Sequence, residues 1–565
     1  MPPIPPSDPA GRQGRTAPFV VLSDLLPGRR DGSDATIGVN GVVDDPVTAA
    51  LATATGRLGG VWIGRTQDPP SGRSHPSLRG LDLDPGDADG YARHANSTIW
   101  PLYHDLVRPA EHDPRWREAY RAVNHAFAAA AAQEAAIGAS VWVHDYHLHL
   151  VPSMLRRLRP DLRIGFYLST MFPPADILQQ TPMHRDMLAG LLGADVVGFQ
   201  AANAAENFLR LSETLPQDTT AVVGSLRPPV DVGVYPTSVD ARVIEQLARR
   251  PEVVRRAAAI RDSLGSPPVV VLSIDAATEA AGIERRLRVI HDLFDSGELH
   301  PEDVVVVQVV TDAPAGVAPD TDAAPDVAEA IAQEAARING RFASIGRACV
   351  HYVRDSPDLY ERVALYLAAD VLVATPLREG ATLPALEFVA VGARDSSLVL
   401  SEFSGTAVVL PEAFLLNPYD EDRLRRSLLA AITAGPTERE RRMSAMRAYV
   451  HSYDTHAWAR LFLLALHAHD HEDSISEWID DAGPVLPGGL AAPAPSPVSR
   501  GSLRAGPATP AGRVTLPGGS MTLAGGQRSV SGGANPLPSG RHRRTDSSGQ
   551  IAARGQASGS ASGFR

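Results

Sequence analysis

The stretch PPVVVLSIDAATEAAGIERRLRVIHDLF (residues 267–294) contains a strand, a loop and the start of a helix in sequence. Residues 269–274 form a continuous apolar run, which is typical of a strand buried on both faces of a parallel sheet. A loop between such a strand and a helix is the usual phosphate-binding position in a doubly wound sheet. This loop carries four alanines, Asp275 and Glu279 but no Lys or Arg. The stretch therefore predicts an α/β fold with a phosphate-type loop that lacks a cation.

Comparable apolar runs recur along the chain and alternate with helical stretches. The predicted strands are FVVLS (19–23), GVWIG (60–64), SVWVH (140–144), RIGFYLS (163–169), DVVGF (195–199), VVVLSI (269–274), VVVVQVV (304–310), VLVAT (371–375) and SLVLS (397–401). This alternation is typical of βα units with parallel strands. The segment RPPVDVGVYPTSVD (227–240) resembles a linker before the second series of strands. We therefore expect two Rossmann-like domains that face each other across a cleft.

The composition at the two ends of the chain differs from that of the body. The segment after residue 490 is rich in Gly, Ser, Pro and Ala, so it cannot bury enough apolar surface to offset the entropy of ordering. We expect a disordered segment over 1–17, an N-terminal Rossmann-like domain over 18–255, a C-terminal Rossmann-like domain over 256–454, a helix that packs back across the cleft with a linker over 455–490, and a disordered basic tail over 491–565.

Cysteine content and hydropathy indicate the compartment. The only cysteine of the 565 residues is Cys349, which excludes a disulfide framework and fits a reducing compartment. No apolar run approaches the roughly 18 residues of a membrane span. The first residues lack the apolar core of a secretory signal. We expect a soluble, cytoplasmic protein without a membrane partner.

The charge is unevenly distributed. Residues 491–565 hold nine arginines and one aspartate, so that a net charge of −12 for the chain leaves −20 for residues 1–490. An acidic body argues against a nucleic-acid partner. In the tail, the basic residues of RHRRTDSS precede Thr545 and Ser547, a pattern that many protein kinases accept. Phosphorylation at these two positions is one hypothesis, and an unmodified, solvated tail is the alternative.

Several segments, taken in order, resemble one enzyme family. They are NSTIWPLYHDL (96–106), VWVHDYHLHLVPSMLRRLRPDLRIGFYL (141–168), GLLGADVVGFQAANAAENFLRL (190–211), ARINGRF (336–342), ADVLVATPLREG (369–380), LVLSEFSGTA (398–407) and LNPYD (416–420). The chain resembles the trehalose-6-phosphate synthases, which are retaining glycosyltransferases with the two-domain GT-B fold. The resemblance extends from about residue 19 to about residue 470.

The resemblance implies a reaction in which glucose moves from a nucleotide donor, usually UDP-glucose, to glucose 6-phosphate. Such an enzyme orients two sugars and stabilises the departing diphosphate with cations and backbone N–H groups. It implies no metal and no separate cofactor. In the family, the loop R-L-D-Y-T-K-G supplies an Arg and a Lys for this purpose. The flanking residues place Ala276 at the Arg position and Ala281 at the Lys position.

Other family positions also differ in this chain. Leu25 takes the place of an Arg that reaches the acceptor phosphate, and Asp45–Pro46 takes the place of a glycine pair close to the donor. Ser169 takes the place of a His that contacts the transferred sugar, and Glu379 replaces an Asp. A further acceptor-phosphate Arg has no counterpart, since residues 311–336 contain no Arg or Lys. The resemblance therefore implies that most phosphate-binding side chains are missing.

Five pocket positions of the family are retained. The resemblance gives Tyr91 and Trp100 as acceptor-site aromatics, Asp145 as a sugar-contacting carboxylate, Glu387 as a ribose-binding glutamate and Leu383 as a neighbouring pocket residue. The alternative for each is a structural role in the cleft wall or the core. His144 and His147 have the spacing of metal ligands, but we interpret both as structural histidines.

Two hypotheses of function follow. The first is a catalytically inactive pseudoenzyme, which acts through an unknown partner protein and binds nucleotide sugars only weakly. The alternative is an active retaining glycosyltransferase with an altered donor or acceptor. Binding of a nucleotide sugar separates the two, because an active enzyme requires it.

Overall fold

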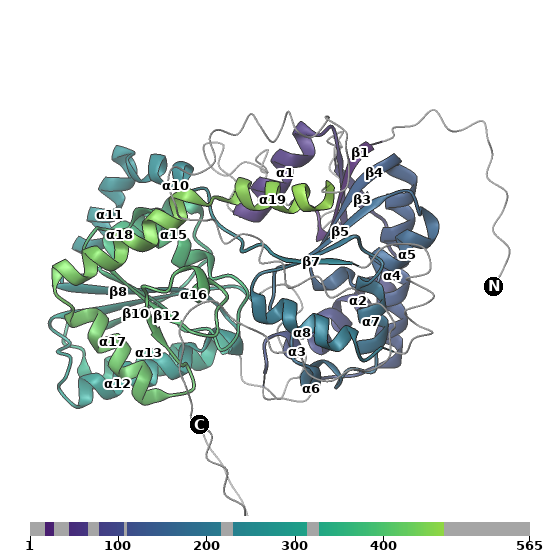
Figure 1. Ribbon diagram of the computed structural model, residues 1–565. Helices are drawn as coiled ribbons and strands as arrows, with labels where there is room; N and C mark the ends of the chain where they lie inside the picture. Colours follow the sequence, from purple (N-terminus) through teal and green to yellow (C-terminus); the bar gives the residue numbers. More distant parts are fainter. Residues whose placement is uncertain are drawn as a thin grey trace, which may run out of the picture. The chain divides into compact units, whose positions relative to one another are not determined.

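The structure is a computed structural model that describes residues 17–27, 45–65, 78–106, 110–215, 230–313 and 327–467. Within these ranges the chain forms two parallel sheets, each flanked by helices (Figure 1). Thr545 and Ser547 lie outside the described residues, as does nearly all of the predicted tail and N-terminal segment. No helix among the described residues is both long enough and apolar enough to cross a lipid bilayer.

The first sheet contains seven parallel strands among the described residues, in the order β3-β2-β1-β4-β5-β6-β7. Its strands are β1 (Ala17–Leu25), β2 (Val61–Arg65), β3 (Leu78–Leu81), β4 (Ala135–His144), β5 (Arg163–Leu168), β6 (Val196–Phe199) and β7 (Asp231–Val234). The apolar runs of the central strands are buried at residues 19–23, 139–143 and 164–168, as their composition predicted.

Helices on both faces cover this sheet. They are α1 (Pro46–Arg57), α2 (Pro85–Arg93), α3 (Trp100–Tyr103), α4 (Pro114–Glu134), α5 (Val151–Leu158), α6 (Ala175–Leu178), α7 (His184–Leu191) and α8 (Ala202–Ser212), with a π-helix η1 (His94–Ile99) and a 3-10 turn η2 (Tyr146–Leu148). Helix α4 illustrates how the local sequence starts a helix. Its N-cap Asp113 accepts a hydrogen bond from the Arg115 backbone amide, and Pro114 occupies the first turn.

The second sheet contains six parallel strands among the described residues, in the order β10-β9-β8-β11-β12-β13. They are β8 (Val269–Ala276), β9 (Val304–Thr311), β10 (Val350–Arg354), β11 (Val371–Ala374), β12 (Ser397–Ser401) and β13 (Phe414–Leu416). Around it lie α10 (Ala241–Ala248), α11 (Pro251–Ser263), η3 (Glu279–Ala281), α12 (Ile283–Asp295), α13 (Val327–Phe342), α14 (Leu359–Ala368), α15 (Leu383–Val391), α16 (Thr406–Val409), α17 (Glu421–Thr433) and α18 (Pro436–Ser452).

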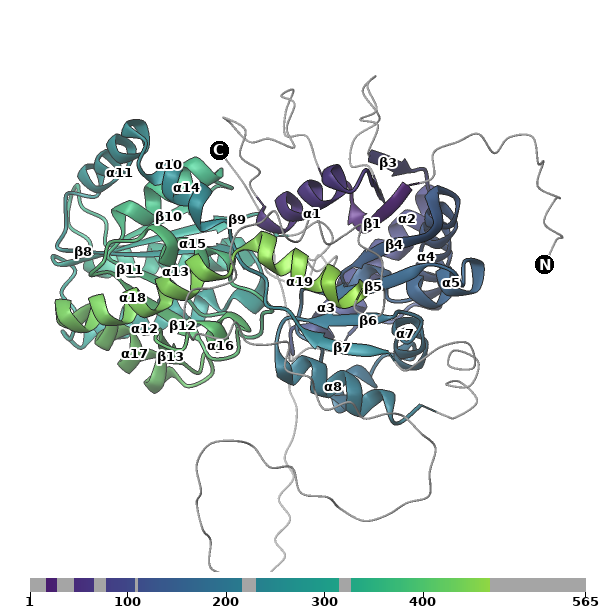
Figure 2. The same ribbon diagram turned by 45° about the horizontal axis from the view of Figure 1, so that its top comes forward.

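The last described helix, α19 (Thr455–His467), follows α18 along the chain but packs against the first sheet beside α1 (Figures 1 and 2). The ring of Phe462 lies over β5 and β6, where Gly165 and Gly198 leave room for it. A Cβ at either glycine would lie 2.7–2.8 Å from this ring, which is too close for a real contact. Glycine in these strands therefore permits the close approach of α19.

All nine strands predicted from apolar runs are present, with ends shifted by a few residues. Four more, β3, β7, β10 and β13, are each three to five residues long and only partly buried. The linker interpretation of residues 227–240 was wrong for residues 231–234, which form the edge strand β7. An edge strand pairs on one side only, so this segment needs no strong apolar pattern.

Candidate active site

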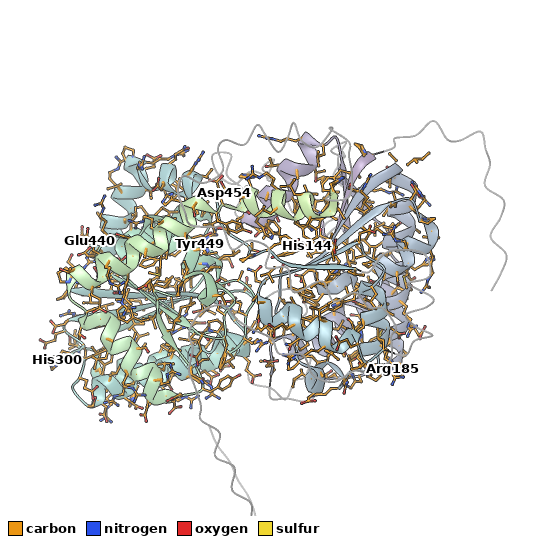
Figure 3. All side chains as sticks on the ribbon, in the orientation of Figure 1. His144, Arg185, His300, Glu440, Tyr449 and Asp454 are labelled. Atoms are coloured by element: carbon orange, nitrogen blue, oxygen red, sulfur yellow. The ribbon has the colours of Figure 1, made fainter. Side chains whose placement is uncertain are left out.

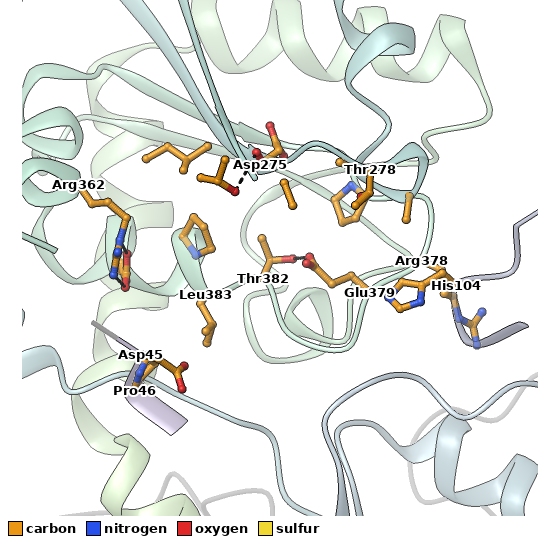
Figure 4. A pocket seen from close by; sticks show the side chains of 18 of the residues that line it. Asp45, Pro46, His104, Asp275, Thr278, Arg362, Arg378, Glu379, Thr382 and Leu383 are labelled. Atoms are coloured by element: carbon orange, nitrogen blue, oxygen red, sulfur yellow. Dashed lines mark hydrogen bonds and ion pairs between the residues drawn. The ribbon is translucent and has the colours of Figure 1, made fainter. Parts of the chain in front are cut away.

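A cavity of about 420 Å³ lies among loops that follow strands of both sheets (Figure 4). Asp45, Pro46, Trp100 and His104 line it from the first sheet's part of the chain. The ends of β8 and β9, the loops after β8 and β11, helix α15 and Arg362 of α14 supply the remaining wall. Ligands of open α/β sheets bind outside the carboxyl ends of the strands, which makes this cavity the candidate site.

The loop after β8 forms part of the wall, as its position in the sequence predicts. Ala276 and Ala281 both line the cavity, and neither provides a charge. Gly282 ends the loop with φ +67°, and a Cβ there would lie 2.4 Å from the Thr375 carbonyl oxygen. Glycine at this position therefore allows both the turn and the contact with the segment after β11.

A buried arginine lies directly behind this loop. The Arg286 side chain is 1% exposed and donates to Asp275 at 2.5 Å, to the Gln308 side-chain oxygen at 2.8 Å and to the Thr375 hydroxyl at 2.8 Å. The Asp275 carboxylate also accepts from the Gln308 amide at 3.0 Å. This guanidinium is committed to the interior, so it holds the loop and does not serve a ligand.

The carboxylate of Glu387 is held by donors from α14. Arg362 donates through Nε and Nη2, each at 3.0 Å, and the Tyr366 hydroxyl donates at 2.7 Å. The Glu387 residue is 3% exposed. Burial and the adjacent Glu387 charge both raise the pKa of Tyr366 well above its usual value, so the phenol stays protonated. The carboxylate that the resemblance assigns to ribose is thus already bonded within the protein.

Arg378, which lines the cavity together with Arg362, forms an ion pair across the cleft. Arg378 Nη1 lies 3.1 Å from Asp105 Oδ2, and both side chains are largely buried, at 15% and 28% exposure. Burial raises the pKa of Asp105, and the neighbouring Arg378 opposes that shift. This pair joins the segment after α3 to the loop after β11.

Glu379 occupies the next position of the same loop. Figure 4 shows its carboxylate bonded to the Thr382 hydroxyl, which also lies 2.8 Å from the Ser404 hydroxyl. Burial raises the pKa of Glu379 to about 7, while the Thr382 bond lowers it in part and the Asp275 charge raises it further. A carboxyl group in this cavity therefore changes its charge near neutral pH.

The wall contributed by Asp45–Pro46 starts a helix. Asp45 is the N-cap of α1, its carboxylate accepts from the Thr48 amide at 2.8 Å, and Pro46 takes the first turn. Asp45 has φ −107°, a conformation that any residue adopts. The residues that the resemblance places at the family's glycine pair therefore form a regular helix start, and Pro46 offers no N–H to the cavity.

Trp100 lies in the opposite wall and stacks on His104, with ring centroids 4.0 Å apart. Burial lowers the pKa of His104 to about 4, so this ring stays neutral at physiological pH. Leu383 also lines the cavity, at the start of α15. Trp100 and Leu383 therefore supply aromatic and apolar surface to the cavity.

Four of the predicted positions do not line the cavity: Leu25, Tyr91, Asp145 and Ser169. Asp145 has φ +70° and ψ 171°, a backbone conformation rarely adopted outside glycine, which marks a strained position next to η2. The Ser169 hydroxyl lies 3.1 Å from His144 Nε2, and its carbonyl touches Gly380 so closely that a Cβ there would be 1.8 Å away. His144 is half-buried, whereas Arg185 and His300 are exposed and lie at the outer edge of the view in Figure 3.

Arg362, Arg378 and Arg286 were not among the site residues predicted from the sequence. No local pattern distinguishes these arginines from surface ones, because their partners lie 11 or more positions away along the chain. The described part of the chain contains no group of three or more His, Cys, Asp or Glu side chains placed to hold a metal ion.

The cavity wall thus carries two arginines and four carboxyl groups among its described residues, namely Arg362, Arg378, Asp45, Asp275, Glu379 and Glu387. Each arginine is already paired with a carboxylate of the chain. Both guanidinium charges are thus balanced by carboxylates of the chain, so a dianionic phosphate would find no net positive charge in the described part of this wall. The hydroxyl groups of a sugar, by contrast, can donate hydrogen bonds to carboxylate oxygens of this wall.

Comparison with known proteins agrees with this fold. The model of glycosyltransferase family 20 matches residues 84–468. The trehalose-6-phosphate synthase of Mycolicibacterium vanbaalenii is 38% identical over 492 residues, covering 82% of this chain and 98% of that protein. A crystal structure of an α,α-trehalose-phosphate synthase (UDP-forming) from Burkholderia vietnamiensis superposes with a TM-score of 0.69 at 26% identity, covering 81% of this chain and 99% of that one.

A second similar structure contains a bound sugar phosphate. The α,α-trehalose-phosphate synthase (UDP-forming) from Burkholderia xenovorans, in complex with glucose 6-phosphate, is 26% identical with a TM-score of 0.68, and the match covers 80% of this chain and all of that one. The two Rossmann-like domains, each with a parallel sheet, thus match nearly the whole length of these synthase structures, and together they form the GT-B fold. The chain therefore belongs to glycosyltransferase family 20, the family of the trehalose-6-phosphate synthases.

Proposed function

We propose that this protein is a trehalose-6-phosphate synthase-like glycosyltransferase with an altered donor or acceptor. It transfers glucose from UDP-glucose to glucose 6-phosphate more slowly than the synthases of the family do. The observation that carries the proposal is the charge of the cavity wall: both of its described arginines are committed to carboxylates, and four carboxyl groups surround the space. The intact fold and a cavity of about 420 Å³ support retained sugar binding.

The size of the expected loss follows from the missing contacts. A hydrogen bond to a charged group is worth about 1.5–3 kcal/mol, and loss of one transition-state donor lowers the rate about 10²–10³-fold. The alanines at 276 and 281 remove two donors that the resemblance places at the diphosphate. Contributions of neighbouring groups are not additive, so a loss of about 10³-fold in trehalose 6-phosphate synthesis is a conservative expectation.

A second candidate function is that of a non-catalytic member that acts through a partner protein. It is favoured by the combination of Ala276 and Ala281 at the donor side with Leu25 at the acceptor side, since changes at both substrates are not explained by one altered specificity. Retention of a fully packed core in both sheets fits either function.

For either function we place the protein in the cytoplasm. One cysteine in 565 residues, Cys349, which is buried and unpaired, supports a reducing compartment.

The test uses the full-length protein and a panel of ligands. Thermal shift and calorimetry with UDP-glucose, GDP-glucose and UDP measure donor binding, and a transfer assay with labelled donors measures product on glucose 6-phosphate and on unphosphorylated sugars. The synthase of Mycolicibacterium vanbaalenii serves as the positive control. The proposal expects donor binding with transfer to an unphosphorylated sugar. No binding of any nucleotide sugar would favour the second candidate.

A further inference from the structure

A polar cluster lies at the carboxyl ends of β1 and β2, outside the cavity described above. In the parallel pairing of these strands, Leu25 and Arg65 are direct Cα partners. Leu25 is the position where the resemblance expects the acceptor-phosphate arginine. A guanidinium therefore reaches this edge of the sheet from the neighbouring strand, although β1 itself carries a leucine.

The contacts of this guanidinium define the cluster. Arg65 donates through Nε and Nη2 to the two carboxylate oxygens of Asp24, each at 2.8 Å. The Tyr91 hydroxyl donates to Asp24 Oδ1 at 2.8 Å, and His147 Nε2 lies 3.9 Å from Asp24 Oδ2. The Arg65 guanidinium also lies over the Tyr91 ring, 5.1 Å from its centroid. Three side chains from three separate segments thus converge on the carboxylate of Asp24.

The charged side chains of the cluster are partly exposed. The side chains of Arg65, Asp24 and His147 are 21%, 15% and 16% exposed, whereas Tyr91 is fully buried behind them. The polar groups therefore remain within reach of a ligand at the carboxyl edge of the sheet, where ligands of open α/β sheets bind.

Asp24 cancels the charge of Arg65. Burial by itself raises the pKa of Asp24, but His147 and Arg65 outweigh it and hold the pKa below its usual value. The carboxylate therefore stays ionised at neutral pH, and the Arg65–Asp24 pair carries no net charge. A phosphate monoester brought to this edge would gain an attraction to Arg65 and meet a similar repulsion from Asp24.

We propose that Asp24 and Arg65 determine the acceptor specificity of this protein and select an unphosphorylated sugar over a sugar phosphate. This inference rests on the proposed function. An ionised carboxylate accepts hydrogen bonds from sugar hydroxyls, and a guanidinium has five N–H donors, of which two are used by Asp24. The two groups side by side match the donor and acceptor faces of adjacent hydroxyl groups, and the hydrogen bond from the Tyr91 hydroxyl holds Asp24 in place.

The first measurement needs no variant. The affinities of the full-length protein for glucose and for glucose 6-phosphate are compared by ligand-observed NMR titration under identical salt and pH. The inference expects glucose 6-phosphate to bind no more tightly than glucose. Tighter binding of glucose 6-phosphate by tenfold or more would overturn it.

The decisive variant is Asp24→Asn, which keeps the size of the side chain and removes the charge that cancels Arg65. The ratio of the two affinities is expected to shift at least tenfold toward glucose 6-phosphate, which corresponds to about 1.4 kcal/mol. Asp186→Asn is the matched control, because Asp186 pairs with Arg121 on the exposed surface of the same part of the chain. That control should leave the ratio unchanged.

The outcomes separate this inference from the function on which it rests. If both sugars bind and Asp24→Asn leaves their ratio unchanged, the specificity role of Asp24 is refuted and the proposed function stands. If the wild-type protein binds neither sugar in the presence of UDP, the proposed function fails with it. If Asp24→Asn does not fold, as judged by its thermal unfolding, the wild-type affinity ratio alone decides.

Discussion

Two aspartate–arginine pairs lie at the carboxyl ends of strands in the two sheets, and they differ in burial. In the second sheet, Asp275 and Arg286 are 8% and 1% exposed and their atoms approach to 2.5 Å. In the first sheet, Asp24 and Arg65 are 15% and 21% exposed and approach to 2.8 Å. The Asp275–Arg286 pair is enclosed by Gln308 and Thr375 and holds a loop. The Asp24–Arg65 pair stays partly exposed. Burial, rather than residue type, separates a structural ion pair from a candidate binding group.

The largest expected effect concerns activity on the family's substrates. With UDP-glucose and glucose 6-phosphate, we expect trehalose 6-phosphate synthesis at least about 10³-fold slower than by the Mycolicibacterium vanbaalenii synthase. The reason is that neither pair described above provides an uncommitted cation, and Ala276 and Ala281 add none. Product formation measured by coupled assay checks this. A rate within tenfold of the control enzyme would contradict it.

Restoring both donor-side cations provides a sharper form of the same test. The double variant Ala276→Arg/Ala281→Lys should recover less than about tenfold in rate, since Pro46 still lacks an N–H and Leu25 still stands where the resemblance expects the acceptor-phosphate arginine. Recovery to the control rate would show that the loop after β8 alone limits the reaction.

The two ion pairs should differ in their effect on stability. Arg286→Ala leaves Asp275 buried without its partner and is expected to lower the free energy of unfolding by about 3–5 kcal/mol. Arg65→Ala exposes Asp24 to water in part and should cost about 1.5–3 kcal/mol. Denaturant unfolding measures both, with Arg288→Ala on the exposed side of α12 as a control expected within about 0.5 kcal/mol. Equal losses for the two pairs would refute the distinction by burial.

Glu379 makes stability depend on pH. Its pKa rises from 4.5 to about 7 on folding, so the folded state binds more protons than the unfolded state between these values. Stability attributable to this group is therefore present below about pH 4.5 and lost as the pH rises toward 7, by at most about 3 kcal/mol. Glu379→Gln should remove this slope and stabilise the protein at pH 8. Unfolding curves of both proteins from pH 5 to pH 8 test the prediction, and parallel curves would contradict it.

The smallest effect concerns Asp45, a carboxylate of the cavity wall that also caps α1. Asp45→Ala should lower the free energy of unfolding by about 1 kcal/mol through loss of the bond to the Thr48 amide. Asp45→Asn keeps that cap and removes the charge, so it should preserve stability. A loss well above 2 kcal/mol in Asp45→Ala would indicate a role beyond capping.

Most of the fold could be predicted because its signal is local. Continuous apolar runs such as residues 304–310 mark buried parallel strands, and alternation with helices gives the fold class. The edge strand β7 was missed, since a strand with one partner and partial exposure needs no apolar run. The position of Ala276 and Ala281 beside a cavity also follows from a local feature, the loop between a strand and a helix.

The two-domain α/β class, the family and the absence of Lys and Arg from the loop after β8 all follow from residue patterns along the chain. The ion-pair partners of the arginines follow only from the three-dimensional arrangement of distant segments. Arg65 meets Asp24 41 positions away, and Arg362 meets Glu387 25 positions away, so no periodicity within a strand or helix records these contacts. Charge pairing depends on distance and burial in space, and both are set when the sheets assemble and bring distant segments to the same edge.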